Sequence, residues 1–395
     1  MFLSKPVQQS TMAGEDNSFV KGLNSFSWKL HQKIQSNGNN VLFSPYSVTS
    51  ALMLAGVGAR GNTGSQILQA LGLQNTASDG AHAEFSQLAD DLRTVLNAGE
   101  GVTLNIANKL FARNDMKVLE DFVTRSEKLY KSGIESMDFG NKPDECRQQI
   151  NTWVEKQTND KIKDLLAEGS IGTSTTLVLT NAIYFKGKWD KQFATERTTK
   201  ADFHVSPSDT VKVDMMRMKQ DLLYLKNDED KFAAVSIPYR ENVSSLLIIL
   251  PNDIDGLTAL ESNMTPDKLG KIITDVRQGF KSKVDLGLPK FTFTETTDLS
   301  RILPELGVTD LFDSSNVDIG GMIDCKGIAF SDVVHKAFIE VNEEGTEAAA
   351  ATAMISRMMM MPTQEVEFIC DRPFLFVLME EKSGLIMFLG RCSKP

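Results

Sequence analysis

The segment from Glu343 to Pro362 restricts the fold more than any other part of this chain. It reads EEGTEAAAATAMISRMMMMP, with runs of four alanines and four methionines, and no proline lies between Pro304 and Pro362. Alanine has the highest helix propensity, so a short surface helix is one interpretation. The methionine run could fill an irregular core gap or form an adaptable binding surface.

An extended strand is the second interpretation of this segment. Without proline, every residue keeps an N–H group that can pair in a sheet. Side chains of a strand alternate between its faces, and the residues on one face would all be small: Thr346, Ala348, Ala350 and Thr352. Such a face can slide between existing strands without overfilling the core. Gly345 permits the turn that would start this insertion, so the pattern predicts a segment outside in one state and inside a sheet in another.

Periodicity along the remaining chain predicts helices first and strands later. Apolar residues from Phe19 to Ile34 lie on one helical face, and residues 150–166 repeat that amphipathic spacing. Ser44 and Pro45 form a helix start, with serine as the cap and proline in the first turn. The helix that follows, to Leu54, is apolar nearly all round and is expected to be buried.

Strand-like runs dominate the later part of the chain: 177–185, 246–250, 284–288, 291–294 and 366–376. Residues 374–377 and 385–389 indicate a closing hairpin that turns at Lys382-Ser383-Gly384. This order favours an α+β fold with large antiparallel sheets over a doubly wound parallel sheet. No internal repeat or flexible linker divides the chain, so we expect a flexible tail at 1–15 and one domain at 16–395.

Catalytic and cofactor motifs give little support to an enzyme. Gly56-Val-Gly58-Ala-Arg-Gly61 matches GxGxxG, but it follows a predicted helix where a dinucleotide site needs a preceding strand, so a closely packed turn is expected. No GxSxG, Walker or HExxH motif is present. None of the four histidines is paired at metal-ligand spacing: His31, His82, His204 and His335. The sequence therefore predicts neither a metal site nor a cofactor.

Charge and cysteine content limit the partners and the compartment. The net charge of −10 and pI near 5.1 argue against nucleic acid or an acidic membrane as the main partner. The four cysteines form no CxxC pair and are expected to be reduced thiols: Cys146, Cys325, Cys370 and Cys392. The N-terminus has no apolar leader, and no apolar stretch could span a membrane. We expect a cytoplasmic protein; secretion without a recognisable signal, with glycosylation at Asn242 or Asn263, is the alternative.

Several segments together resemble the serpin family of serine protease inhibitors. Residues 343–352 resemble its proximal hinge, and Phe368–Leu378 resembles its C-terminal signature. Further similar blocks occur in the family's order: Asn40–Ser47, Asn151–Glu155, Thr180–Trp189, Leu288–Phe291, Leu306–Phe312 and His335–Ala337. The resemblance implies three β-sheets, eight or nine helices and an exposed reactive-centre loop at about 343–364.

The resemblance also implies roles for particular residues. The hinge comprises Gly345, Thr346, Glu347, Ala348, Ala349, Ala350, Ala351 and Thr352. The family's loop length places the bait residue at Met359 and the scissile bond at Met359–Met360, with Arg357 or Met358 as alternative baits. A polar cluster where the main sheet opens, called the shutter, is assigned to Ser44, Ser47, Asn181 and His335. Trp189 is assigned to the breach, where insertion begins. A lone histidine on a strand is usually a core residue with satisfied hydrogen bonds. A shutter residue would also bond to neighbouring polar groups across the sheet, so the two interpretations of His335 predict the same contacts.

The implied activity is mechanical. A protease attacks the bait residue, and insertion of the cleaved loop into the sheet traps the acyl-enzyme. Met359 favours targets of chymotrypsin or elastase type, whereas Arg357 would favour a trypsin-like target. The ending and the missing leader resemble the intracellular ovalbumin-like branch, which includes non-inhibitory carriers or chaperones. Residues 81–101 hold a single Arg93 against four acidic residues, so heparin activation is not expected, and we expect a monomer.

Overall fold

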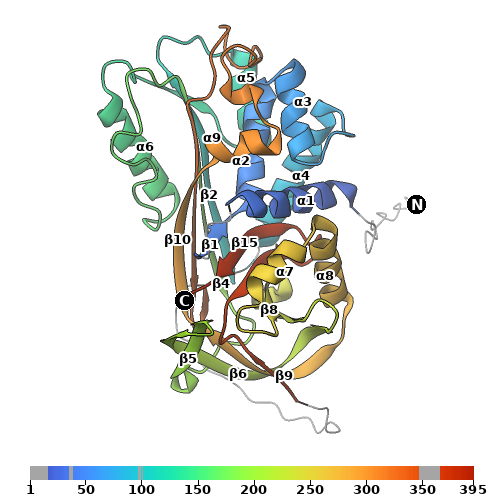
Figure 1. The fold of residues 1–395 in the computed structure, drawn as a ribbon. Coiled ribbons are helices and arrows are strands. Elements are labelled where there is room, and N and C mark those ends of the chain that lie inside the picture. Colours follow the sequence, from blue (N-terminus) through green and yellow to red (C-terminus); the bar gives the residue numbers. More distant parts are fainter. Residues whose placement is uncertain (1–16, 35–38, 97–98, 100, 347–364) are drawn as a thin grey trace, which may run out of the picture.

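The computed structural model describes residues 17–34, 39–96, 99, 101–346 and 365–395 (Figure 1). The predicted tail at 1–15 lies outside them. The described part contains nine α-helices: α1 (Ser18–Ile34), α2 (Pro45–Gly58), α3 (Gly61–Ala70), α4 (Ser78–Leu96), α5 (Glu120–Tyr130), α6 (Pro143–Gln157), α7 (Leu257–Asn263), α8 (Pro266–Gln278) and α9 (Leu299–Ile302). Its strands are β1 (Val41–Phe43), β2 (Val102–Arg113), β3 (Ile134–Met137), β4 (Leu177–Lys188), β5 (Thr199–Ser206), β6 (Asp209–Asn227), β7 (Phe232–Pro238), β8 (Ser244–Pro251), β9 (Lys281–Pro289), β10 (Phe291–Asp298), β11 (Asp332–Val341), β12 (Gly345–Thr346), β13 (Val366–Ile369), β14 (Phe374–Glu380) and β15 (Ile386–Cys392).

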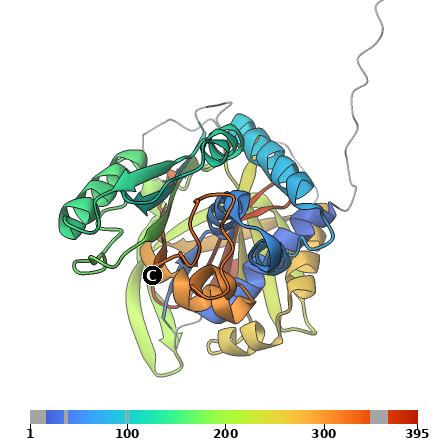
Figure 2. The same ribbon diagram turned by 90° about the horizontal axis from the view of Figure 1, so that it is seen from above.

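The smaller sheet has the strand order β10-β11-β4-β2-β3, with β12 beside β4. Helix α6 covers part of one face, and α2 with its neighbours covers the other (Figures 1 and 2), while alternate residues of β10 remain exposed. Alternate residues of β4 divide accordingly: Leu179 and Ile183 join the main core, and Ala182 and Tyr184 pack with residues from α6. Because the side chains of a strand alternate between its faces, β4 contributes to one core on each side of the sheet.

The larger sheet has nine strands in the order β1-β15-β14-β8-β7-β6-β9-β13, with β5 also beside β6. Three sheets were expected, but the described strands form two. The reason is the length of β6, which pairs with β5 and β9 over Asp209–Leu223 and with β7 over Leu223–Asn227. One strand therefore joins two of the expected sheets into a continuous one, and the predicted α+β class is confirmed.

Most of the predicted elements are confirmed, with two differences. The helix predicted at 150–166 ends at Gln157. Asn159, Asp160 and Asp164 have positive φ angles of 51°, 60° and 48°, which a continuing right-handed helix excludes. The strand predicted at 366–376 is interrupted between Ile369 and Phe374. Pro373 lies in this break and cannot donate a hydrogen bond to a sheet.

The glycine-rich motif is a site of close packing, as predicted. Gly58 is the last residue of α2, and a Cβ there would lie 2.4 Å from the Cβ of Met322. Gly61 opens α3 with a φ of +51°, a conformation that favours glycine. The motif joins two helices and does not follow a strand.

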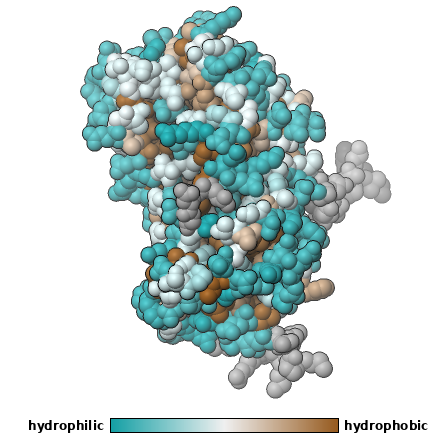
Figure 3. Space-filling model, in the orientation of Figure 1, coloured by the Kyte–Doolittle hydropathy of each residue, from teal (hydrophilic) through white to brown (hydrophobic). Residues whose placement is uncertain are grey.

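The outer surface agrees with this burial pattern. In the view of Figure 3, hydrophobic residues appear as small separate areas within a mostly hydrophilic surface. Among the described residues, Phe280 is the one large hydrophobic residue that is fully exposed.

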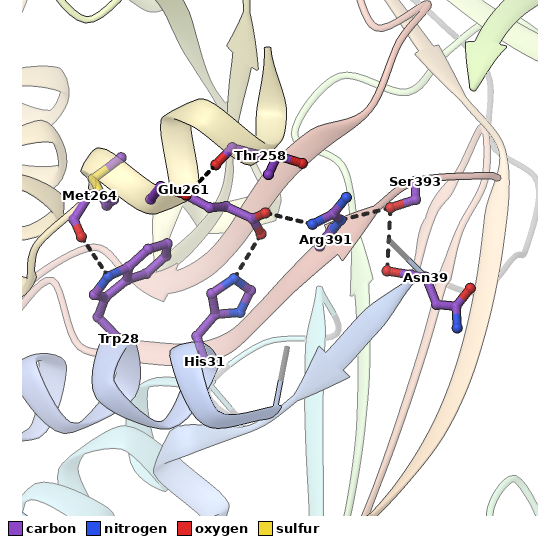
Figure 4. A network of polar contacts seen from close by, with 9 residues as sticks. Trp28, His31, Asn39, Thr258, Glu261, Met264, Arg391 and Ser393 are labelled. Carbon is purple, nitrogen blue, oxygen red and sulfur yellow. Dashed lines mark hydrogen bonds and ion pairs between the residues drawn. The ribbon is translucent and has the colours of Figure 1, made fainter. Parts of the chain in front are cut away.

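A buried charged network joins the two ends of the chain (Figure 4). Glu261 of α7 contacts His31 of α1 at 3.0 Å and Arg391 of β15 at 2.6 Å. Arg391 also donates to the Ser393 hydroxyl at 2.8 Å. The side chains of His31 and Glu261 are almost completely buried, so the contact between them has little access to water. This network fastens α1 to the C-terminal strand through α7.

We expect Glu261→Leu to lower the free energy of unfolding by about 3–5 kcal/mol, because it leaves the Arg391 charge buried without a partner. Urea unfolding at neutral pH measures the change. Glu305→Leu is the matched control, since Glu305 pairs with Lys33 of the same helix α1 while remaining exposed. The control should cost about 1 kcal/mol or less. Equal losses in the two variants would contradict the assignment.

Candidate functional site

The parallel pairing of β11 with β4 lies in the middle of the smaller sheet. Seven residue pairs join the two strands, from Asp332↔Val178 to Phe338↔Tyr184. On their other edges, β11 pairs with β10 and β4 pairs with β2. We call the β11–β4 pairing the seam, because a new strand could enter here only by separating these seven pairs.

A polar cluster lies directly beneath the seam, at the N-terminus of α2. His335 and Asn181 are opposite each other in the β11–β4 register, and their side chains are hydrogen-bonded. The Ser44 N–H donates to His335 Nε2 at 3.0 Å. Nε2 is therefore the acceptor, and Nδ1–H donates to Asn181 Oδ1. The Asn181 amide in turn donates to the Ser47 carbonyl at 2.9 Å and the Ser47 hydroxyl at 2.7 Å.

The sequence that folds this cluster is the capped start of α2. The Ser44 hydroxyl accepts the N–H of Ser47 at 3.1 Å and donates to the Met387 carbonyl at 2.5 Å. The cap therefore fixes the helix end under the sheet and links it to β15. The structure thus brings together all four residues that the resemblance assigned to the shutter.

Burial sets the protonation state of this cluster. His335 is completely buried, and burial lowers its pKa from 6.5 to about 3. The imidazole is therefore neutral at pH 7, as the hydrogen bond from Ser44 requires. Asn108 of β2 also belongs to the cluster, because its Oδ1 accepts from the Asn181 amide. The resemblance did not assign Asn108; a polar residue on the otherwise apolar core face of β2 was the available signal.

The hinge begins at the end of the seam where β4 reaches Lys188. After β11 the chain turns through Asn342–Glu344 and returns as β12, which pairs antiparallel with β4. Gly345 lies opposite Lys188, and Thr346 lies opposite Gly187. Hydrogen bonds between Asn342 and Gly345 close the turn, with N···O distances of 2.9 and 3.3 Å. The first two hinge residues thus already lie beside β4.

Only glycine fits at position 345. Its φ is +141°, in a region that L side chains rarely adopt. A Cβ there would lie 2.0 Å from the Gly187 carbonyl oxygen and 2.6 Å from the Lys188 Cα. Both the backbone conformation and the close approach to β4 therefore require this residue.

Trp189 contacts the turn Asn342–Glu344 that leads into the hinge. Its ring is fully buried and stacks on Tyr239 with centroids 4.5 Å apart and an interplanar angle of 15°. The indole N–H donates to the Asn342 carbonyl at 2.9 Å, and the backbone N–H of Trp189 donates to the Glu344 carbonyl at 3.0 Å. The residue that the resemblance assigned to the breach therefore contacts the start of the hinge directly.

Glu343, in the same turn, is held by Lys290 and Thr198, and we call these three residues the clamp. The Glu343 carboxylate accepts from Lys290 Nζ at 2.9 Å and from the Thr198 hydroxyl at 2.8 Å. Burial alone would raise the pKa of Glu343, but the hydrogen bonds from Lys290 and Thr198 bring this pKa below its ordinary value. Sequence reasoning missed the clamp, because nothing local indicates that Glu343 meets residues so distant in the chain.

The other predicted loop residues lie outside the described residues: Glu347, Ala348, Ala349, Ala350, Ala351, Thr352, Arg357, Met358, Met359 and Met360. The described chain resumes at Glu365 and enters β13, which pairs with β9. Within the described ranges, no group of three or more His, Cys, Asp or Glu residues could hold a metal ion. No described helix combines the length and apolar character needed to cross a membrane.

Comparison with known proteins identifies relatives along almost the whole chain. A family model described as Serpin (serine protease inhibitor) matches residues 21–395. Serpin B3 of Homo sapiens is 38% identical over 394 residues, covering 96% of this chain and 100% of that protein. Leukocyte elastase inhibitor of Homo sapiens is 39% identical over 360 residues, covering 90% of this chain and 93% of that protein. The structure of uncleaved ovalbumin is similar with a TM-score of 0.84 at 26% identity, covering 96% of this chain and 100% of that chain.

These relatives confirm two of the predictions made from the sequence. The serpin fold is confirmed, with relatives of the ovalbumin-like branch among the matches. The predicted class of molecule, a protease inhibitor, is also confirmed, since the family model is described as a serine protease inhibitor and one relative is named as an elastase inhibitor.

Acidification should destabilise the protein through His335. Because the folded pKa of about 3 lies below the ordinary value of 6.5, the unfolded chain gains a proton first as the pH falls. The stability that is present above pH 6.5 should be lost at up to about 1.4 kcal/mol per pH unit from this one group. Urea unfolding between pH 7 and pH 5 measures the slope. His335→Gln should reduce the slope while lowering stability at pH 7, and the part that remains should include the contribution of His82, whose pKa is also lowered by burial. An unchanged slope in His335→Gln would refute the assignment.

The clamp on the turn can be tested by exchanging its charges. Glu343→Lys should lower the free energy of unfolding by roughly 2 kcal/mol, because two cations then face each other at a mostly buried site. Lys290→Glu alone should also destabilise. The double variant should regain part of the loss, which urea unfolding of all four proteins would reveal as a coupling energy. Strictly additive losses would rule out a direct interaction.

Proposed function

The chain belongs to the serpin family, and we propose that it traps a serine protease of chymotrypsin or elastase type as a covalent acyl-enzyme by inserting its loop into the seam. One observation carries the proposal. The first two hinge residues, Gly345 and Thr346, already pair with the C-terminal end of β4, and the sequence continues into small residues that can follow the same path. A rigid loop without this start would present a bait but no means of holding the protease.

Cleavage would proceed at the bond between Met359 and Met360. The protease serine attacks the Met359 carbonyl, the peptide C–N bond breaks, and an ester joins Met359 to the protease while Met360 becomes a free amine. The Met359 side of the loop is then released from its C-terminal anchor at β13 and can move with the attached protease. An unbranched apolar bait suits a protease with an apolar specificity pocket.

Insertion is favourable because it changes the type of strand pairing. The seam is a parallel interface, whereas β12 runs antiparallel to β4. Since β11 and β4 are parallel, a strand continuing from β12 would be antiparallel to both. One parallel interface is exchanged for two antiparallel interfaces, which form more hydrogen bonds and are slightly more stable per residue.

The register of β12 assigns a place to every inserted residue. With Thr346 opposite Gly187, each further residue pairs one position earlier on β4. Ala348 would then lie opposite Phe185 and Ala350 opposite Ile183, which both face the main core. Their small side chains allow the strand to pass over this core without overpacking.

Thr352 would reach the level of the polar cluster. Continuing the same register places it opposite Asn181, between β4 and β11. Separation of the seam breaks the hydrogen bond between His335 and Asn181, and a buried polar group left without a partner is costly. The Thr352 hydroxyl can both donate and accept, so it can satisfy the two side chains that the seam releases. The hydrogen bonds of His335 and Asn181 would thus be satisfied both before and after insertion.

Incubation with chymotrypsin, elastase and trypsin, followed by denaturing gels, tests the proposal. We expect the wild-type chain to form a denaturation-resistant complex with chymotrypsin or elastase. Thr346→Arg should be cleaved but should form no complex, because insertion would bury an unpaired charge against the core. Glu347→Gln is the control, since residue 347 would face the opposite side of the strand and the variant should still form the complex.

Three outcomes would overturn parts of the proposal. A stable complex with Thr346→Arg would contradict insertion through the hinge. A complex formed with trypsin alone would indicate Arg357 as the bait. Cleavage without any complex and without a rise in melting temperature would identify a non-inhibitory member of the family, because insertion adds strand pairs that the uncut protein lacks.

A further inference from the structure

A surface groove of about 620 Å³ lies among the end of α2, α3, the first turn of α4 and α5. Its lining residues carry two guanidinium groups, Arg60 and Arg125, and one carboxylate, Asp79, within the part of the chain that the structure describes. This balance is opposite to that of the whole chain, whose net charge is −10. Val57 and Leu68 add apolar surface to the lining. The groove therefore combines positive charge with an apolar wall.

Arg60 is held in a fixed position at one side of the groove. Its Nη1 atom donates to the carbonyls of Val57 at 2.9 Å and Ala59 at 2.8 Å. A Cβ on Gly321 would lie 2.1 Å from Arg60 Nη2, so the glycine provides the space that the guanidinium occupies. The remaining nitrogens of this group make no hydrogen bond in the described chain. A cation that is already positioned loses little entropy when an anion binds.

Arg125 faces the same groove from α5. Its Nη2 atom contacts Asp79 Oδ1 at 2.7 Å, and the Asp79 side chain is 87% exposed. Exposed ion pairs of this kind contribute little to stability. An incoming carboxylate can therefore replace Asp79 at the guanidinium without a large cost.

The pKa of His82, which also lines the groove, is affected by the charges of both arginines. His82 is buried, and its Nδ1 lies 2.5 Å from the Tyr130 hydroxyl. Burial first, and then the charges of Arg125 and Arg60, lower the pKa of His82 to about 4, while Asp79 and a hydrogen bond with the Gly56 backbone act in the opposite direction. Both guanidinium groups thus project positive potential to the same point.

We propose that this groove binds a small organic anion, with its carboxylate between Arg60 and Arg125 and its apolar body against Val57 and Leu68. The volume is within the range of about 300–1,000 Å³ that small-molecule sites occupy. The planar guanidinium fork matches the geometry of a carboxylate and binds it through two parallel hydrogen bonds. This binding site is separate from the seam and does not depend on protease inhibition.

Titration calorimetry of the full chain with 4-phenylbutyrate tests the site. Its uncharged amide, 4-phenylbutyramide, has the same shape and should bind at least about tenfold more weakly, since a hydrogen bond to a charged group is lost. Arg125→Gln and Arg60→Gln should each weaken 4-phenylbutyrate by about tenfold or more for the same reason. Arg93→Gln, on α4 outside the groove lining, should leave the affinity unchanged.

Arg60→Gln also removes the hydrogen bonds to the carbonyls of Val57 and Ala59 at the end of α2. A second variant therefore tests the groove without removing these bonds. Gly64→Leu places an aliphatic side chain in the groove, and a Cβ at this helical position meets neighbours only at ordinary contact distances of 3.5 Å or more. It should abolish binding while preserving the fold. No measurable binding of 4-phenylbutyrate, equal affinity for the amide, or unchanged affinity in both Arg125→Gln and Gly64→Leu would overturn the proposal.

Discussion

The parallel pairing of β11 with β4 is the constraint on which the rest of the molecule depends. It joins two internal strands by seven residue pairs and is bridged by the side chains of His335 and Asn181. The capped N-terminus of α2 is hydrogen-bonded to it on the core side of the sheet. The turn held by Trp189 and Glu343 lies at one end of the pairing, where β4 ends. Because the weaker type of pairing occupies the centre of the sheet, the proposed insertion of a further antiparallel strand would replace it with the stronger type.

Local physical rules explain which features could be predicted from the sequence. Ser44 and Pro45 define the start of α2, because capping and a fixed proline φ act within one turn. The closing hairpin of β14 and β15 likewise follows from turn chemistry and strand alternation. His335, Asn181 and Trp189 were assigned from resemblance alone, and the structure now places each beside a named partner. The roles proposed for Met359 and its neighbours rest on the loop count and lie outside the described residues.

The missed features depend on contacts between distant parts of the chain. Glu343 meets Lys290 and Thr198 only after several strands have paired, and Asn108 joins the polar cluster through the register of β2 with β4. Helical periodicity continued past Gln157, yet the positive φ angles that follow depend on how the chain packs against β11. The joining of two expected sheets through β6 is a matter of strand length and register, which periodicity does not determine.

The position of the last strand has a consequence for biosynthesis. β1 lies near the beginning of the chain, and its described partner is β15, which ends three residues before the C-terminus. Arg391 on the same strand also closes the buried network around Glu261. The early strand β1 and helix α7 can therefore complete their contacts only after β15 has been synthesised. Until then the unpaired edge of β1 and the incomplete network around Glu261 leave the growing chain open to association with its neighbours.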